Sequence, residues 1–207
     1  MKKRIYALIL GGIFTLAGCP LTSIAQTAST AEPTTVTKGK PYKENWANTK
    51  VILKKKIWTV EDKNNDNYTW EDLDAGAPAY NGANATVNAD DWLVSPPLHL
   101  IAGQTYALEA GAVVGGHSGT GQRMNIAYGT GDDPTTYNEI VPTTPISGTA
   151  FGTPTTIKTT FTPTETGDYR IGFHAVSDRP GYIIMRPVKV EEAAETSGTP
   201  IAISDLK

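Results

Sequence analysis

The chain has 207 residues, of which 39% are hydrophobic, 8% aromatic and 19% charged, and its formal net charge is -3. This length indicates one domain with tails, and the apolar content is enough for a core, which excludes wholesale disorder. The single cysteine excludes an intrachain disulfide framework and a cysteine-based zinc cluster. The acidic balance excludes the basic field that drives non-specific nucleic-acid binding.

The N-terminus is predicted to be a targeting signal. Lys2, Lys3 and Arg4 precede an apolar run over residues 5–18, which is shorter than the ~20 apolar residues of a membrane-spanning helix. This pattern is typical of a secretory signal, so residues 1–25 are predicted to be a signal peptide and the mature protein to be extracytoplasmic. Removing these cations leaves 15 basic against 21 acidic residues, a net charge of -6, which disfavours nucleic acid and anionic membrane as partners.

The signal offers two processing sites. Residues 16–19, LAGC, are similar to a bacterial lipobox, in which Cys19 would be lipidated and anchor a lipoprotein at the cell surface or outer membrane. Residues 23–25, SIA, instead fit an ordinary signal peptidase and a secreted product. The sequence leaves both alternatives open, and a membrane is expected as a partner only through the lipid at Cys19.

The next segment and the C-terminus are low in complexity. Residues 26–39 include the Thr-rich stretch TASTAEPTTVTK, which predicts a flexible tether. The folded domain is predicted over residues 40–192. Residues 193–207 are predicted to be a linker that ends in IAISDLK, which is either the first strand of a following domain or a tail that pairs with a sheet edge.

Within the domain the hydrophobic period is two. Apolar residues alternate with polar or small ones over residues 106–112, 124–129, 157–161, 169–176 and 182–190. Gly- and Asp-rich turn signals separate these segments, so each predicts a strand with one buried face. Many such strands predict an all-β sandwich or barrel of mostly antiparallel strands.

Several segments resemble a known family when they are taken in chain order. They are PYKENW (41–46), IWTVEDKNNDNYTW (57–70), AYNGANA (79–85), DDWLVSPPLHLIAGQTYALEAGA (90–112), TPTETGDYRIGFHAVS (162–177) and YIIMRPVKV (182–190). Together they resemble the bacterial cleaved-adhesin family, also called choice-of-anchor J, whose fold is similar to the jelly-roll β-sandwich of MAM domains. The resemblance covers about residues 41–190.

This resemblance implies a noncatalytic binding or adhesion module of a Gram-negative surface or secreted protein. The implied partner is a protein or glycan on a host or neighbouring cell. In related jelly rolls a first-strand Glu and acids of the last strand hold calcium. Glu44 fits the first position, but Met185 and Arg186 stand where the acids are expected.

A second calcium candidate is the loop DKNNDNY at residues 62–68. Asp62, Asn64 and Asp66 carry oxygen side chains at alternate positions, and calcium prefers six to eight oxygen ligands. The pattern therefore allows a structural calcium ion, which is the one cofactor candidate. The alternative is an Asx-rich turn that is capped by its own side chains without a metal.

The aromatic residues suggest an alternative function. Trp70 and Tyr80 flank the polar loop EDLDAGAP, and Tyr68 precedes it, so these three are the candidates for a carbohydrate-binding face. Trp58 and Trp92 lie in strongly apolar segments and are predicted to be core residues, as most such aromatics are.

No catalytic constellation is predicted. The acid pairs at residues 90–91 and 132–133 are interpreted as solvated turn residues, and the three histidines lack metal-ligand spacing. The protein is therefore predicted not to be an enzyme.

Overall fold

The computed structural model describes residues 29–46, 53, 56–73, 76–115, 121–148, 152–178 and 181–194. The predicted signal peptide, Cys19 and most of the C-terminal segment lie outside the described residues. Within the described part, no helix has the length and apolar character that crossing a membrane requires.

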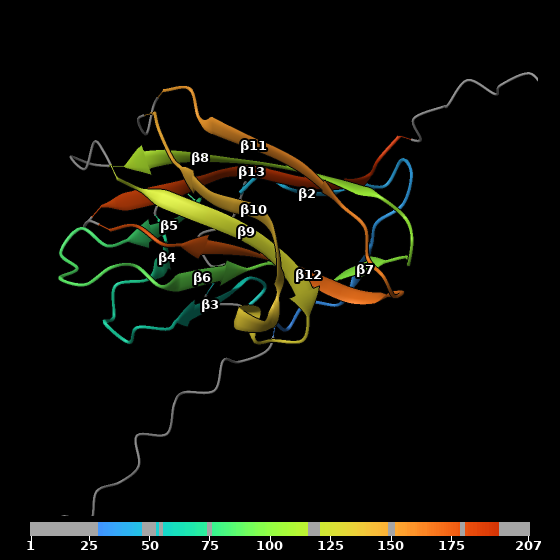
Figure 1. The fold of residues 1–207 in the computed structure, drawn as a ribbon, viewed down its shortest axis with the longest axis horizontal. Coiled ribbons are helices and arrows are strands. Elements are labelled where there is room, and N and C mark those ends of the chain that lie inside the picture. The colour runs from blue at the N-terminus through green and yellow to red at the C-terminus, as the bar shows by residue number, and fades with distance from the viewer. Residues whose placement is uncertain are drawn as a thin grey trace, which may run out of the picture.

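Two sheets make up the fold, as Figure 1 shows. The seven-stranded sheet contains β1 (Thr34–Thr35), β7 (Leu98–Leu100), β12 (Gly167–Ala175), β6 (Asp91–Val94), β3 (Thr59–Asp62), β9 (Arg123–Thr130) and β10 (Asn138–Pro145). The six-stranded sheet contains β11 (Thr155–Phe161), β8 (Tyr106–Gly115), β13 (Tyr182–Glu192), β5 (Pro78–Asn81), β4 (Trp70–Asp72) and β2 (Tyr42–Glu44). All strand pairs are antiparallel except β1 with β7. The prediction of a β-sandwich is confirmed.

The core lies between the sheets and follows the predicted alternation. Along β12, Tyr169, Ile171 and Phe173 are each less than 10% exposed. Trp58 is completely buried and packs against Phe173, with ring centroids 6.0 Å apart, and against Trp46 at 5.0 Å. The prediction that Trp58 is a core residue is confirmed, and its burial contributes on the order of 2–3 kcal/mol.

Strand β12 joins two successive strands of its own sheet. Its C-terminal half pairs with β6 and its N-terminal half with β7. Between β6 and β7 the chain runs through Pro96 and Pro97, which have no N–H groups to donate. Ser95 is the last residue before this interruption that pairs with β12: its N–H donates to the Ile171 carbonyl at 2.9 Å, and its Oγ accepts the Ile171 N–H at 2.9 Å.

The segment predicted to be a tether is partly folded. Thr34 and Thr35 form β1 on the edge of β7, and Val36 is only 1% exposed. The Lys38 N–H donates to Glu192 at 2.7 Å, which links the segment to the end of β13. A flexible tether over residues 26–39 is therefore wrong for residues 34–38, because an isolated valine in a Thr-rich run fills a place at the sandwich edge.

Candidate functional site

The structure does not place Trp70 and Tyr80 on a surface. Trp70 is 3% exposed and Tyr80 1%. They are register partners of β4 and β5, their ring centroids are 6.1 Å apart, and Trp70 Nε1 donates to the Asp91 carbonyl at 3.1 Å. An exposed binding face at these two residues is wrong, because both rings point into the sandwich. Tyr68 lies half-buried in the loop before β4.

A different aromatic residue lies on the outer face of the seven-stranded sheet. Glu61 of β3, Trp92 of β6, His174 of β12 and Asn125 of β9 are successive register partners. Register partners in antiparallel strands point to the same side of a sheet. Their sequence neighbours Leu93, Phe173 and Ile126 belong to the core, so this outer row faces away from it. The row brings together residues from four strands, which no local motif could reveal.

Trp92 and His174 form the centre of the outer row. Their rings are stacked with centroids 4.0 Å apart and an interplanar angle of 8°. Tyr137, which follows the short 3-10 helix Pro134–Thr136, meets Trp92 edge-on at 6.5 Å. Trp92 is only 6% exposed. The prediction that it is buried is confirmed, but it packs on the outer face in a small cluster with Val94 and Ala127.

Glycine makes room for this outer packing. A Cβ on Gly172 would lie 2.8 Å from the Trp92 ring, and a Cβ on Gly129 would lie 2.4 Å from the Tyr137 ring. Such distances are far inside van der Waals contact, so any larger residue would displace these rings. The two glycines of β12 and β9 therefore allow the aromatic cluster to lie flat on the sheet.

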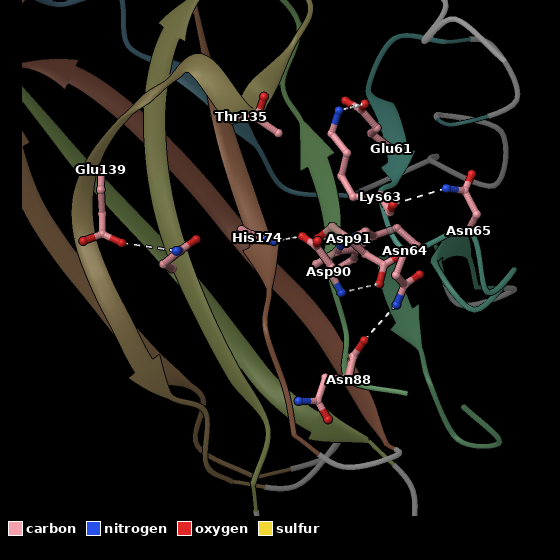
Figure 2. A network of polar contacts seen from close by, with 12 residues as sticks. Glu61, Lys63, Asn64, Asn65, Asn88, Asp90, Asp91, Thr135, Glu139 and His174 are labelled. Carbon is pink, nitrogen blue, oxygen red and sulfur yellow. Dashed lines mark hydrogen bonds and ion pairs between the residues drawn. The ribbon is translucent and has the colours of Figure 1, made fainter. Parts of the chain in front are cut away.

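His174 is held in one orientation. Its Nε2 lies 2.7 Å from Asp90 Oδ1, and Figure 2 shows this contact. Burial lowers the pKa of His174, and the carboxylate of Asp90 opposes that shift. Because a carboxylate can only accept, Nε2 carries the proton, which leaves Nδ1 of the neutral ring as a hydrogen-bond acceptor.

Two polar atoms beside His174 lack partners. Among the described residues, neither Trp92 Nε1 nor Asn125 Oδ1 has a hydrogen-bond partner. The Asn125 amide donates to Glu139 of β10 at 3.2 Å, which extends the row to a fifth strand. The outer row therefore combines an aromatic centre with one unmatched donor, one unmatched acceptor and, through Glu139, an exposed carboxylate.

The loop over residues 62–68 is closed by its own side chains. Asn64 Oδ1 accepts the Asp66 N–H at 3.2 Å, Asp66 Oδ1 accepts the Tyr68 N–H at 2.8 Å, and Asp62 Oδ2 accepts the Asn67 N–H at 2.9 Å. Asn64 Nδ2 also donates to the Asn88 carbonyl at 2.8 Å, as Figure 2 shows. The side chain of Asn64, one of the three predicted calcium ligands, is thus already used by the turn.

The predicted exposure of Asp91 is wrong. It was expected in a solvated turn but is completely buried. It is the register partner of Asp62, which places both carboxyl groups on the inner side of the sheet. Burial is the main reason that the pKa of Asp91 is raised to about 7, and Asp62 and Asp66 raise it further, while the hydroxyl of Thr69 acts in the opposite direction.

The family's calcium position does not fit this chain. Glu44 Oε1 accepts the Trp46 N–H at 2.8 Å, and Met185, which stands where an acid is expected, is completely buried. Within the described residues, no group of three or more His, Cys, Asp or Glu side chains is arranged, as it stands, to hold a metal ion.

Comparisons with known proteins identify the fold. No protein-family model matches the sequence, and no curated protein matches it. Among solved structures, the K1 cleaved adhesin domain of Lys-gingipain from Porphyromonas gingivalis is similar, with a TM-score of 0.55 and 16% identity over 74% of this chain and 99% of that chain. The K2 domain gives a TM-score of 0.55 and 15% identity, covering 72% and 98%, and the K3 domain 0.50 and 17%, covering 66% and 92%. The chain therefore has the β-sandwich fold of the cleaved adhesin domains of Lys-gingipain.

Proposed function

We propose that the protein is a noncatalytic adhesion module that acts outside the cytoplasm, on the surface of a Gram-negative bacterium or after secretion from it. The fold likeness to domains described as adhesins supports a binding role, although a fold by itself does not determine a function. The predicted signal peptide supports export. The partner in this proposal is a protein or glycan on a host or neighbouring cell.

The observation that carries the proposal is the outer row of Glu61, Trp92, His174 and Asn125. Each residue sits on a strand rather than on a loop, and sites on rigid elements hold their geometry better. The Trp92–His174 stack and the Asp90 contact fix the centre of the row. A ligand would therefore meet a preformed surface, which lowers the entropic cost of binding.

A second candidate function is carbohydrate binding at the same row. A sugar hydroxyl both donates and accepts, and the row offers both kinds of atom in Trp92 Nε1 and Asn125 Oδ1. The proposed glycan site is therefore no longer at Trp70 and Tyr80, which belong to the six-stranded sheet and point into the sandwich. It lies on the outer face of the seven-stranded sheet, around Trp92. Both unmatched atoms are buried, so this alternative requires the His174 ring to move off the Trp92 indole, whereas the adhesion proposal uses the surface as it stands.

The test is a binding screen of the purified protein against a glycan array and a panel of cell-surface proteins. The row variants are Asn125→Ala, at a half-buried position, and Glu139→Ala, at the exposed position that accepts from the Asn125 amide. Glu109→Ala is the matched control, because Glu109 is an exposed, ion-paired residue on β8 of the other sheet. We expect a loss of affinity of about 10-fold or more, equivalent to ~1.4 kcal/mol, in the row variants and none in the control.

The outcome identifies the ligand class. Glycan binding that is lost in both row variants supports the carbohydrate alternative, and protein binding with the same loss supports adhesion through a protein. Unchanged affinity in folded row variants would show that this face is not the binding surface.

The mode of attachment needs a separate experiment. In the lipoprotein alternative, Cys19→Ala moves the protein from the membrane fraction to the soluble extracytoplasmic fraction. In the secretion alternative, the same substitution changes nothing. Metabolic labelling with a fatty acid gives the same distinction without relying on fractionation.

A further inference from the structure

Four side chains that accept hydrogen bonds lie together in the outer row. Asp90 precedes β6 and contacts His174 Nε2 at 2.7 Å, and the amide of Asn125 on β9 donates to Glu139 of β10 at 3.2 Å. His174 and Asn125 are register partners, so their Cβ atoms are ~5 Å apart. Burial lowers the pKa of His174, and the carboxylates of Asp90 and Glu139 both oppose this shift, which requires both to lie near the ring. Figure 2 shows His174 between these two carboxylates.

The unused capacity of these side chains is for accepting hydrogen bonds. Asn125 Oδ1 is buried and lacks a partner among the described residues, and a buried acceptor in that state indicates that a donor belongs there. Since Nε2 of the neutral His174 ring carries the proton, its Nδ1 is an acceptor, and within the described part of the chain no hydrogen bond reaches it. Each carboxylate also keeps lone pairs beyond the contact that it makes. The group that complements this set is one that only donates.

No lysine or arginine of the described residues forms an ion pair with Asp90 or Glu139. Three basic side chains of the same sheet are paired with other acids, namely Lys63 with Glu61, Arg123 with Asp178 and Arg170 with Asp132. The Asp90 side chain is 52% exposed and Glu139 is exposed, so both carboxylates can be reached from outside. The centre of the outer row therefore attracts a cation that the chain itself does not supply.

We propose that the outer row binds an arginine side chain of a partner protein between Asp90 and Glu139. A guanidinium group is always charged, and it has five N–H donors in a planar fork and no acceptor. It can form charge-assisted hydrogen bonds with both carboxylates and donate to His174 Nδ1. This inference rests on the proposed adhesion function, and it narrows the partner to a protein, because glycans do not carry guanidinium groups.

Arginine fits this set better than lysine. A lysine ammonium has three donors and is more strongly hydrated, whereas the row offers acceptors on four side chains. The Trp92–His174 stack stays in place, because the carboxylates and His174 Nδ1 are approached from the outer face. Asn125 is only partly buried, so a rotation of its amide brings Oδ1 to the ligand. Trp92 Nε1 is a donor, for which a guanidinium has no acceptor, and it is not part of the site.

The experiment is a titration of the purified, nitrogen-15-labelled protein with three blocked pentapeptides, followed by amide chemical shifts. The peptides carry arginine, lysine or citrulline between pairs of glycines. We expect saturable shifts at His174 and at the backbone and side-chain amides of Asn125 with the arginine peptide, and a Kd in the millimolar range. The lysine peptide should bind about 3-fold or more weakly. Citrulline, which keeps the shape of arginine without its charge, should cause no saturable shift.

Two variants and a matched control locate the binding. Glu139→Gln and Asp90→Asn keep an oxygen for the Asn125 amide and for His174 Nε2, so both should fold. Each removes one charge and should reduce the affinity for the arginine peptide by about 10-fold. Asp168→Asn is the control, because Asp168 forms the other Asp–His pair of this sheet, with His99 at 2.8 Å. It lies ~20 Å from His174 along β12, and its substitution should leave the affinity unchanged.

The proposal would be overturned by equal binding of the arginine and citrulline peptides, or by the absence of saturable shifts up to ~20 mM peptide. Glu139→Gln and Asp90→Asn proteins that bind like the wild type would also refute it.

A protein partner separates this inference from the adhesion function. If its binding is lost in Asn125→Ala but neither salt nor the arginine peptide weakens it, adhesion at the row stands and the arginine site is wrong. If the peptide binds as expected while the row variants keep the partner, the arginine site is supported and the row is not the adhesion surface.

Discussion

Ser95 should be essential for joining β6 and β7 to β12. Its side chain is 1% exposed, and its Oγ accepts the Ile171 N–H in the place that a backbone carbonyl takes in a regular ladder. In Ser95→Ala the Ile171 N–H keeps its buried position but loses its acceptor. A buried donor without a partner costs about 1–3 kcal/mol, so the free energy of unfolding should fall by this amount.

Urea unfolding followed by tryptophan fluorescence measures this loss. For a chain of this size each kcal/mol corresponds to roughly 2–4 °C in Tm, so thermal melting should show a decrease of about 2–12 °C. The matched control is Ser147→Ala, an exposed serine whose hydroxyl contacts Thr155, for which a change within about 0.5 kcal/mol is expected.

Hydrogen exchange provides an independent measure of the same contact. The Ile171 amide should lose protection in Ser95→Ala, while amides at the far end of β12 should not be selectively affected. If Ser95→Ala were as stable as Ser147→Ala and the Ile171 amide stayed protected, the side chain of Ser95 would not be the partner that completes the sheet.

Three further predictions follow from the described contacts. Trp70→Ala should lower the free energy of unfolding by about 3–5 kcal/mol in urea titrations, because it empties part of the core; a loss below 1 kcal/mol would contradict its burial. Gly172→Ala should cost about 1–3 kcal/mol through overpacking against Trp92 and should change the near-UV circular dichroism, whereas an unchanged spectrum and Tm would mean that the ring is not held there. Burial lowers the pKa of His174, so the unfolded chain takes up a proton first, and the contribution of His174 to the free energy of unfolding should decrease as the pH falls from ~7.5 through the ordinary histidine value of ~6.5. The raised pKa of Asp91 acts in the opposite direction over the same range, so the measured quantity is the difference in free energy of unfolding between the wild type and His174→Gln; a difference that does not change with pH would exclude the His174 contribution.

Local pattern was sufficient to predict the β-sandwich. The alternation in segments such as residues 169–176 records which side of each strand meets the core, and this information is present in the sequence itself. The same reasoning correctly placed Trp58 in the core. It failed at Val36, because one buried residue in a polar stretch leaves no periodic signal.

The sequence by itself determined the class of fold, the order of its strands and the presence of an Asx-rich loop with its own capping side chains. Only the tertiary structure decided which polar and aromatic residues meet. Trp70 and Tyr80 flank a polar loop yet point inward, while Trp92 in an apolar strand lies beside His174, 82 positions away, on the outer face. Asp91 looked like a solvated turn residue, and its burial opposite Asp62 depends on the register of β3 and β6. Strand pairing between distant segments sets these neighbours, and no local spacing encodes it.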